Sequence, residues 1–183
     1  MVSRRCFSQR FLLGNRKDTN MANTTEDLRA SLRVMSEGFR RLGGAPGSWM
    51  LGEVVLRLGV ECVAQPFPRR WRRRPPKQCF ANAAALVRRA AGLTYCEGFV
   101  ARPPLALPVH HAWAINEDRE VFDPTLDDPE VCAYIGVPIT RADYDAQTHH
   151  GRSDSASVFL TAIGTVEIDY ILAKCPAMRE LMP

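Results

Sequence analysis

The chain has 183 residues, of which 46% are hydrophobic, and it carries a formal net charge of +4 at pH 7. This size and composition suit one domain with a sizeable core and exclude a disordered or fibrous protein. No apolar run reaches the roughly 18 to 20 residues that cross a bilayer, and the N-terminus lacks the pattern of a secretory signal peptide. We therefore expect no membrane association and no secretion.

The cysteines and the first residues bear on the location of the protein. The six cysteines show neither a CxxC pair nor the close spacing of a zinc site, in a chain too long to need a disulfide framework. We expect reduced thiols in a cytoplasmic protein. Residues 1–20 contain five basic residues and one acidic residue, which account for the whole net charge. Because Met21 opens a segment with its own helix start, residues 1–20 are interpreted as a leader or disordered extension, with a mitochondrial presequence as the alternative.

Two helices are predicted in the N-terminal part of the chain. A hydroxyl cap at Thr24, acids in the first turn and apolar residues every three or four positions predict an amphipathic helix that ends at Gly43. A second, shorter helix is predicted from Ser48, its expected cap, to Gly59, and extended chain runs from there into prolines. Residues 21–68 thus form a helical N-terminal part.

Residues 69–183 are expected to form an α+β core, in one domain with the N-terminal helices. This core opens with RRWRRRPPKQ, which is predicted to be a loop because consecutive prolines and like charges oppose helix formation. Helix resumes at Cys79 and is expected to reach Gly92. The period then changes to alternation in LTYCEGFVARP, VHHAWAIN and REVFDPT, which predicts antiparallel strands, the last two joined as a hairpin by NEDRE.

The remaining segments give weaker signals. Beyond Pro124 the pattern predicts a loop, a short strand and a turn, followed by a polar loop. Residues 157–176 are ambiguous, since their β-branched content favours a strand whereas part of their apolar spacing fits a helix.

Three residues follow one another in the order of a thiol catalytic triad: Cys79 at a predicted helix start, His111 in a strand and Asp123 at the end of the next strand. The unpaired N–H groups and the dipole of a helix N-terminus favour thiolate over thiol. A neighbouring histidine forms an ion pair with the thiolate and later returns its proton to the leaving group. An aspartate on the other ring nitrogen orients the imidazole and stabilises its charged form.

The predicted hairpin brings two of these residues together. If its turn centres near Glu117 and Asp118, residue 111 lies opposite residue 123 or 124. We therefore expect Asp123 to lie beside His111 across the hairpin.

The choice between the two adjacent histidines rests on strand alternation. His110 and His111 point to opposite faces of the strand. We select His111 because it shares its face with Trp113 and Ile115, apolar residues expected to cover the helix. For the same reason we expect no metal site from the four histidines, since adjacent strand histidines diverge and no HxxxH or HxH spacing is present.

A series of motifs resembles the transglutaminase-like and papain-like group of cysteine hydrolases and acyltransferases: QCFANA, YCEGFV, HHAWAI, VFDPT and YIGVPI. More narrowly, the series resembles uncharacterised bacterial and phage proteins with C-x-x-N-A, Y-x-E-G, H-A-W and D-P-T motifs. The resemblance covers about residues 70–140. It implies an α+β fold with a papain-like or transglutaminase-like core, in which the nucleophile's helix packs on an antiparallel sheet. It also implies Cys79 as nucleophile, His111 as base and Asp123 as the orienting acid.

Departures from related families leave the substrate open. Arylamine N-acetyltransferases share the order of residues, but they carry RGG-x-C where this chain has RRPPKQC, so coenzyme A transfer is the less favoured alternative. Transglutaminases proper place a tryptophan after the cysteine, where this chain has Phe80. We expect a hydrolase or acyltransferase that attacks an amide, ester or thioester carbonyl of a protein, peptide or small molecule through a covalent thioester, without metal or organic cofactor.

Four further residues are candidates for oxyanion binding or for lining the substrate cleft. Gln78 is a candidate oxyanion donor together with the backbone N–H of Cys79. Asn82, one turn later, either orients a substrate or bonds to a neighbouring loop. Glu97 and Trp113 are candidates to line the cleft, with a core position as the alternative for Trp113.

The basic run within residues 69–77 admits three interpretations. It is a solvated loop, an electropositive rim that attracts an acidic partner, or a nucleic-acid contact with Trp71 as a stacking platform. The loop is favoured, and nucleic acid is least favoured because no binding fold or wider basic balance accompanies it. A non-catalytic binding module that docks an acidic partner or nucleic acid here is the competing function. The residues of the rim are Arg72, Arg73, Arg74 and Lys77.

Overall fold

The computed structural model describes residues 24–43, 46–103, 105–149 and 155–158. The expectations for residues 1–20 and for the ambiguous segment after residue 158 lie outside this part of the chain. None of the described helices is long and apolar enough to cross a membrane.

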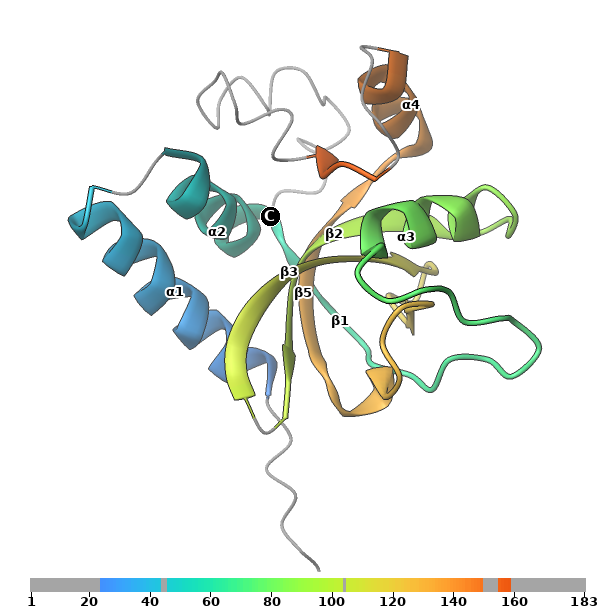
Figure 1. Cartoon of the computed structure of the whole chain (residues 1–183), viewed down its shortest axis with the longest axis horizontal. Coiled ribbons are helices and arrows are strands. Elements are labelled where there is room, and N and C mark those ends of the chain that lie inside the picture. The colour runs from blue at the N-terminus through green and yellow to red at the C-terminus, as the bar shows by residue number, and fades with distance from the viewer. Residues whose placement is uncertain (1–23, 44–45, 104, 150–154, 159–183) are drawn as a thin grey trace, which may run out of the picture.

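Helices and one antiparallel sheet make up the fold (Figure 1). The strands stand in the order β1-β5-β2-β3-β4, and the sheet is strongly curved. This mixture agrees with the expected α+β class. The elements are α1 (Thr25–Arg41), α2 (Pro46–Leu58), β1 (Val60–Cys62), α3 (Cys79–Val87), β2 (Thr94–Arg102), β3 (Leu105–Ile115), β4 (Val121–Phe122), a 3₁₀ turn (Pro129–Val131), β5 (Ala133–Ile139) and α4 (Arg141–His149).

The N-terminal helices begin differently from one another. The Thr24 hydroxyl accepts from the Asp27 N–H at 3.1 Å, and the Asp27 carboxylate accepts from the Thr24 N–H at 3.0 Å, which completes a capping box. Gly43, with φ +67°, follows the end of α1 as predicted. The predicted cap of α2 is wrong: the helix begins at Pro46, and Ser48 lies inside it. Proline suits the first turn because its φ is already helical and it has no N–H to satisfy.

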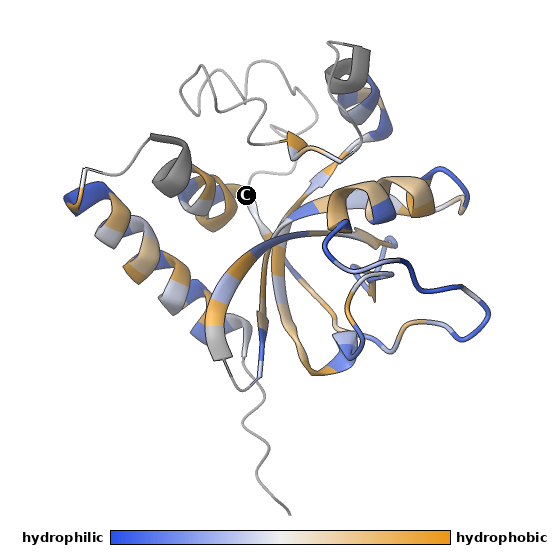
Figure 2. Cartoon of the chain, viewed as in Figure 1, coloured by the Kyte–Doolittle hydropathy of each residue, from blue (hydrophilic) through white to orange (hydrophobic). Residues whose placement is uncertain are grey.

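The faces of the sheet pack into separate cores. One core joins α1, α2 and α3 to the sheet: Leu28, Leu32, Val54, Val55, Ala83, Ala84, Tyr95, Phe99, Ala112 and Ile135 belong to it. The other lies on the opposite face: Cys62, Cys96, Val100, Trp113, Ile115, Val121, Cys132 and Tyr134 belong to it. Figure 2 shows apolar residues along α3 and along the strands of the sheet.

This division corrects one prediction about β3. Trp113 and Ile115 do not cover a helix, because they belong to the core on the face without α1, α2 and α3. The helices pack on the alternate residues, and Ala112 contacts their core. The ring of Phe80, the second residue of α3, lies 5.1 Å from the ring of His110. His110 therefore points toward the helices, and His111 points to the other face.

The helix α3 and the strand β5 also differ from the predicted pattern. α3 ends at Val87 rather than reaching Gly92, and the chain then turns, with Gly92 at φ +81°. The short strand predicted beyond Pro124 is the seven-residue β5, which lies between β1 and β2. The sheet therefore depends on a segment with a weak sequence signal.

Close packing around Trp113 requires a glycine in β5. A Cβ atom at Gly136 would lie 2.7 Å from ring carbons of Trp113 and 2.8 Å from the Cys96 sulfur, and both residues are fully buried. We expect Gly136→Ala to lower the free energy of unfolding in urea by roughly 2 to 3 kcal/mol through overpacking. Gly38→Ala is the matched control, because nothing lies within 4 Å of its Cβ position and a helical alanine is favoured there. Equal stability of the two variants would contradict this packing.

Candidate active site

Cys79 is the first residue of α3, as the sequence predicts. The preceding loop turns sharply at Lys77, whose φ is +63°. Gln78 follows at the N-cap position, where its exposed side chain makes no capping bond. The first N–H groups of a helix have no acceptor within the helix, so the half-buried thiol lies at a cluster of backbone donors.

The start of α3 lies against a length of β3 that pairs with β2 on one edge and is left open by β4 on the other. β4 pairs only with Ala114 and Ile115, so it does not reach the part of β3 that holds the histidines. Phe80 contacts the His110 ring, and the Cys79 thiol interacts with the His111 side chain. Phe80 thus contacts the histidine on one face of β3, and Cys79 contacts the histidine on the other face.

His111 is joined to a buried carboxylate. Its Nε2–H donates to Oδ2 of Asp123 at 2.7 Å, and the His111 and Asp123 side chains are 6% and 0% exposed. Because Nε2 bonds to the carboxylate, Nδ1 is the ring nitrogen that remains for the thiol. The three residues of the predicted triad therefore form one continuous chain of contacts.

The predicted register of the hairpin is wrong, although Asp123 does lie beside His111 as predicted. Ala114 lies opposite Phe122 and Ile115 opposite Val121, so the register places Asp123 beyond the end of β4 rather than opposite His111. The turn accounts for the difference: Arg119, at φ +61°, makes it one residue longer than a turn made of Glu117 and Asp118 alone. A diagonal neighbour is still within reach of an imidazole ring.

Asp123 is held by four hydrogen bonds. Its Oδ2 also accepts from the Tyr134 hydroxyl at 3.0 Å, and its Oδ1 accepts from the N–H groups of Thr125 and Leu126 at 2.8 and 3.2 Å. Tyr134 was not predicted, because nothing in its own segment of the sequence points to a carboxylate 11 residues away. Burial and the charge of Asp123 raise the pKa of Tyr134 well above its ordinary value, which keeps its hydroxyl a donor.

These contacts decide the protonation of the histidine and the carboxyl. Burial by itself lowers the pKa of His111, but the hydrogen bond and charge of Asp123 and the contact with Cys79 outweigh it and raise the pKa from 6.5 to about 9. Burial raises the pKa of Asp123, but the hydrogen bond and charge of His111 outweigh it and hold this pKa below its ordinary value. At neutral pH the pair is therefore an imidazolium and a carboxylate.

Asn82 connects the surrounding loops. Its side-chain amide donates to the carbonyl of Pro75 at 2.8 Å and to the hydroxyl of Thr125 at 3.1 Å, and the residue is buried. Of its two predicted roles, the bond to neighbouring loops is the one that the structure displays. Asn82 positions the loop before Cys79 relative to the loop after Asp123.

Glu97 and Trp113 do not form part of the exposed surface beside Cys79. Both are fully buried. Glu97 accepts from the Tyr95 hydroxyl at 3.1 Å and from His110 Nε2 at 2.9 Å on the helix side of the sheet. The Trp113 ring lies 6.2 Å from the His111 ring and nearly parallel to it, with an interplanar angle of 21°. Both predicted lining residues therefore lie beneath the site, where they support its histidines.

The basic loop is anchored beside the triad. Arg73 donates to the carbonyls of Leu126 and Asp127, and the Arg74 N–H donates to the Pro124 carbonyl. The Trp71 ring lies 5.3 Å from the Phe122 ring at the end of β4. The basic loop thus runs along the segment that carries Asp123, which is the position that the rim interpretation expects.

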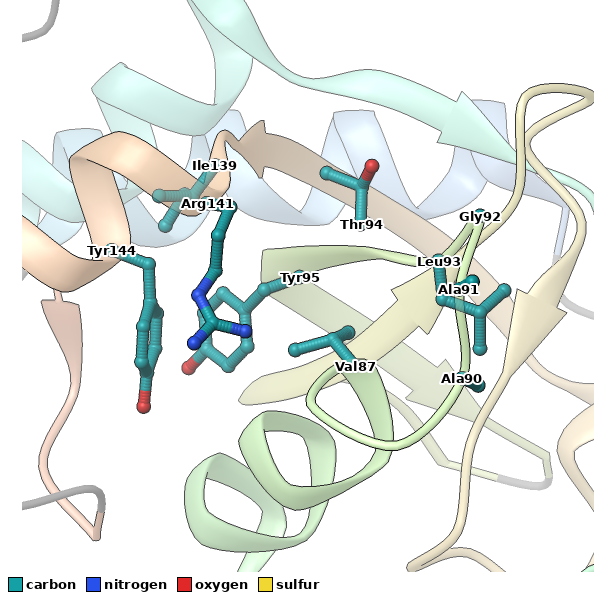
Figure 3. A pocket seen from close by; sticks show the side chains of 10 residues that line it. All are labelled: Val87, Ala90, Ala91, Gly92, Leu93, Thr94, Tyr95, Ile139, Arg141 and Tyr144. Atoms are coloured by element: carbon teal, nitrogen blue, oxygen red, sulfur yellow. The ribbon is translucent and has the colours of Figure 1, made fainter.

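Three further described cysteines lie outside the triad, and one of them, Cys132, contacts the Tyr134 hydroxyl that bonds to Asp123. Cys62, Cys96 and Cys132 are free and buried, and burial raises the pKa of Cys132 to about 11. A cavity of about 190 Å³ lies between the turn after α3 and the start of α4, lined by Tyr95 and Arg141 among others, and no triad residue lines it (Figure 3). Within the described ranges, no group of three or more histidine, cysteine and acidic residues is placed to hold a metal ion.

Comparison with known proteins adds no assignment to this site. No family model, no curated protein and no solved structure matches the chain. The chemistry of the site therefore has to be argued from its own geometry.

Proposed function

We propose that this protein is a thiol-dependent hydrolase or acyltransferase in which Cys79 attacks an amide, ester or thioester carbonyl. The observation that carries the proposal is the chain of contacts from Cys79 through His111 to the buried carboxylate of Asp123. A papain-like or transglutaminase-like core is part of the proposal. It is supported by a nucleophile helix that packs on an antiparallel sheet, with the base on strand β3 and the acid directly after strand β4.

In the proposed resting state, the imidazolium of His111 lies between the Asp123 carboxylate and the Cys79 sulfur. Asp123 accepts one ring N–H, and the other ring nitrogen serves the thiolate of Cys79. A thiolate so paired attacks without waiting for a base, and the positive end of the α3 dipole favours its charge.

Acylation then proceeds in two steps. The sulfur forms a bond to the carbonyl carbon, and the carbonyl oxygen becomes an oxyanion that the backbone N–H of Cys79 is placed to bind, with Gln78 as a second donor. When the tetrahedral intermediate collapses, the bond to the leaving group breaks and His111 gives that group its proton. The product is a thioester on Cys79 and a neutral His111.

Deacylation returns the enzyme to its starting state. Neutral His111 takes a proton from water or from an amine, the resulting nucleophile attacks the thioester carbon, and the carbon–sulfur bond breaks to regenerate the thiolate. Water gives hydrolysis and an amine gives acyl transfer. Asp123 keeps the ring oriented and stabilises its charge throughout.

An activated ester tests the proposal without knowledge of the natural substrate. We expect p-nitrophenyl acetate to place one acetyl group on Cys79, detected by intact mass and by peptide mapping. Cys79→Ala is expected to abolish this adduct, and His111→Ala to slow its formation roughly 100-fold or more, because the imidazolium that stabilises the attacking thiolate is lost. Cys62→Ala, which removes a buried thiol of β1, is the control and should leave the adduct on Cys79 unchanged.

Two outcomes would contradict the proposal. Acetylation spread evenly over the cysteines would show that Cys79 is not activated, and an unchanged rate in His111→Ala would remove the histidine from the mechanism. Acetyl coenzyme A in place of the ester examines the arylamine N-acetyltransferase alternative. That alternative requires an acetyl thioester on Cys79 from this donor.

A further inference from the structure

A large pocket lies between the basic loop and α3. Its volume is about 690 Å³, and it is lined on one side by residues 70–75 and on the other by Ala85 and Leu86 of α3 and by Arg89 and Ala90 of the turn after it. Figure 2 shows the loop as a hydrophilic stretch that runs beside the helix. The pocket therefore has a polar wall and an apolar wall, which suits a ligand with both kinds of surface.

The polar wall is almost purely cationic. Five arginines line the pocket: Arg70, Arg72, Arg73 and Arg74 from the loop and Arg89 from the turn after α3. Among the described residues, no acidic side chain lines it. Arg73 is held by backbone carbonyls, but no ion pair in the described part of the chain joins the other four to an acidic side chain. Their combined field attracts anions into the pocket.

The pocket lies on the same side of α3 as the thiol. Cys79, Asn82 and Leu86 are spaced i, i+3 and i+7, which places them along one side of a helix, whereas Ala84 packs toward the sheet. Asn82 also donates to the carbonyl of Pro75, which lines the pocket. The bond between Asn82 and Pro75 thus links the first turn of α3 to the wall of the pocket that carries the arginines.

The length of α3 sets the distance between Cys79 and the arginines of the pocket. At about 1.5 Å per residue, Leu86 lies roughly 10 Å along the axis from Cys79, and the turn after α3 roughly 15 Å. An extended polypeptide advances about 3.3 Å per residue, so roughly three to five residues cover this distance.

We propose that this pocket binds acidic side chains of a polypeptide substrate, about three to five residues from the residue whose carbonyl Cys79 attacks. This inference rests on the proposed function and specifies its substrate. Carboxylates pair with guanidinium groups through two parallel hydrogen bonds, and the aliphatic stems of glutamates contact the apolar wall. Specificity then comes from the arginines rather than from the triad.

Two matched peptides test the inference. Each carries a terminal chloroacetyl group, which alkylates a thiol with loss of chloride, and then three glycines followed by three glutamates or by three glutamines. We expect the glutamate peptide to alkylate Cys79 at least about tenfold faster at low salt. The difference should disappear in the double variant Arg72→Gln/Arg89→Gln and in high salt, where exposed charges are screened.

Matched controls separate docking from thiol reactivity. The double variant Arg33→Gln/Arg57→Gln removes the same charge from exposed positions on α1 and α2 and should keep the preference. Iodoacetamide, which has no acidic part, should label Cys79 at the same rate in all three proteins. A fall in the iodoacetamide rate in Arg72→Gln/Arg89→Gln would overturn the inference, because it would assign these arginines to the thiol itself.

The outcomes distinguish the two proposals. Selective iodoacetamide labelling of Cys79 with equal rates for the two peptides overturns the pocket assignment and leaves the proposed function intact. If Cys79 is not selectively labelled, the proposed function fails.

The pocket is then tested by binding alone, with fluorescence anisotropy of a glutamate peptide that lacks the chloroacetyl group. Binding that is lost in Arg72→Gln/Arg89→Gln supports the assignment of the pocket to acidic side chains. The assignment is overturned if the peptide does not bind, or if a single-stranded oligonucleotide displaces it at a concentration lower than that of the peptide.

Discussion

Replacing Asp123 by asparagine is expected to lower the pKa of His111 from about 9 to near or below its ordinary value of 6.5. Burial lowers this pKa, and the charge and hydrogen bond of Asp123 are the main interactions that overcome burial. Asparagine keeps the shape of the side chain but removes the charge. NMR titration of the imidazole measures the result directly, because the ring carbon shifts report protonation.

The same change alters the pH dependence of stability. A histidine whose pKa is higher in the folded than in the unfolded protein stabilises the fold fully below 6.5, and this contribution is lost as the pH rises to about 9. Each unit of pKa difference corresponds to about 1.4 kcal/mol. We therefore expect the free energy of unfolding of the unaltered protein to fall by a few kcal/mol across this window. Asp123→Asn should lose most of that slope.

An exposed aspartate in the β3–β4 turn supplies the control. Asp118→Asn removes the same charge from the surface and should leave both the His111 titration and the slope unchanged. Iodoacetamide labelling at pH 7 should fall in Asp123→Asn, because a neutral imidazole no longer pairs with the thiolate. A His111 that still titrates near 9 in this variant would show that Asp123 does not hold the imidazolium.

The positions of Cys79 and Asp123 could be read from the sequence because each follows a local rule. Two prolines and a basic loop stop before Cys79, and an alanine-rich run follows it, so the helix start is fixed by neighbours in the chain. Asp123 opens the sequence D-P-T, and its side chain accepts from the N–H of Thr125 as an Asx turn requires. Local rules succeed where a conformation depends on adjacent residues.

The face of β3 that the helices cover could not be read from the sequence. Residues 111–115 are all buried, so alternation along the strand does not distinguish an inner face from an outer one. The contact between Phe80 and His110 settles the question, and it joins residues 30 positions apart in the chain. The prediction chose the histidine that bonds to Asp123, but the reason given for the choice was wrong.

Pro138 is the reason that the sequence does not predict a central position for β5. Proline argues against a central strand because it lacks the N–H that a ladder needs. β1 pairs only with Tyr134–Gly136, and Pro138 lies past the end of β1, opposite Cys96 of β2. Proline is therefore tolerated in a central strand where its neighbour on one side has already ended.

Glu97→Ala is expected to cause the largest loss of stability among these variants, roughly 3 to 5 kcal/mol in urea denaturation. Glu97 is fully buried and accepts from Tyr95, from His110 and from the N–H of Val158 at 2.9 Å. The Ser157 hydroxyl also donates to it. Alanine leaves these donors without their acceptor in a site closed to water, and buried unsatisfied groups are costly.

Glutamine at the same position separates charge from shape. Glu97→Gln retains one acceptor oxygen but turns an N–H₂ toward donors, so it should also destabilise the protein, by less than alanine does. Glu117→Ala, in the exposed turn after β3, is the control and should be nearly neutral. Equal stability of Glu97→Ala and Glu117→Ala would contradict the role of the buried network.

Glu97 is also expected to support the structure around the site without taking part in the chemistry at Cys79. Glu97 reaches His110 on the helix side of the sheet, whereas the thiol meets His111 on the other side. Amide exchange at Val158 should therefore accelerate in Glu97→Gln, because its acceptor is weakened, while iodoacetamide labelling of Cys79 in the folded variant stays close to that of the unaltered protein. If labelling fell as far as in Asp123→Asn, Glu97 would act on the thiol itself, and the division of the two histidines between structure and catalysis would be wrong.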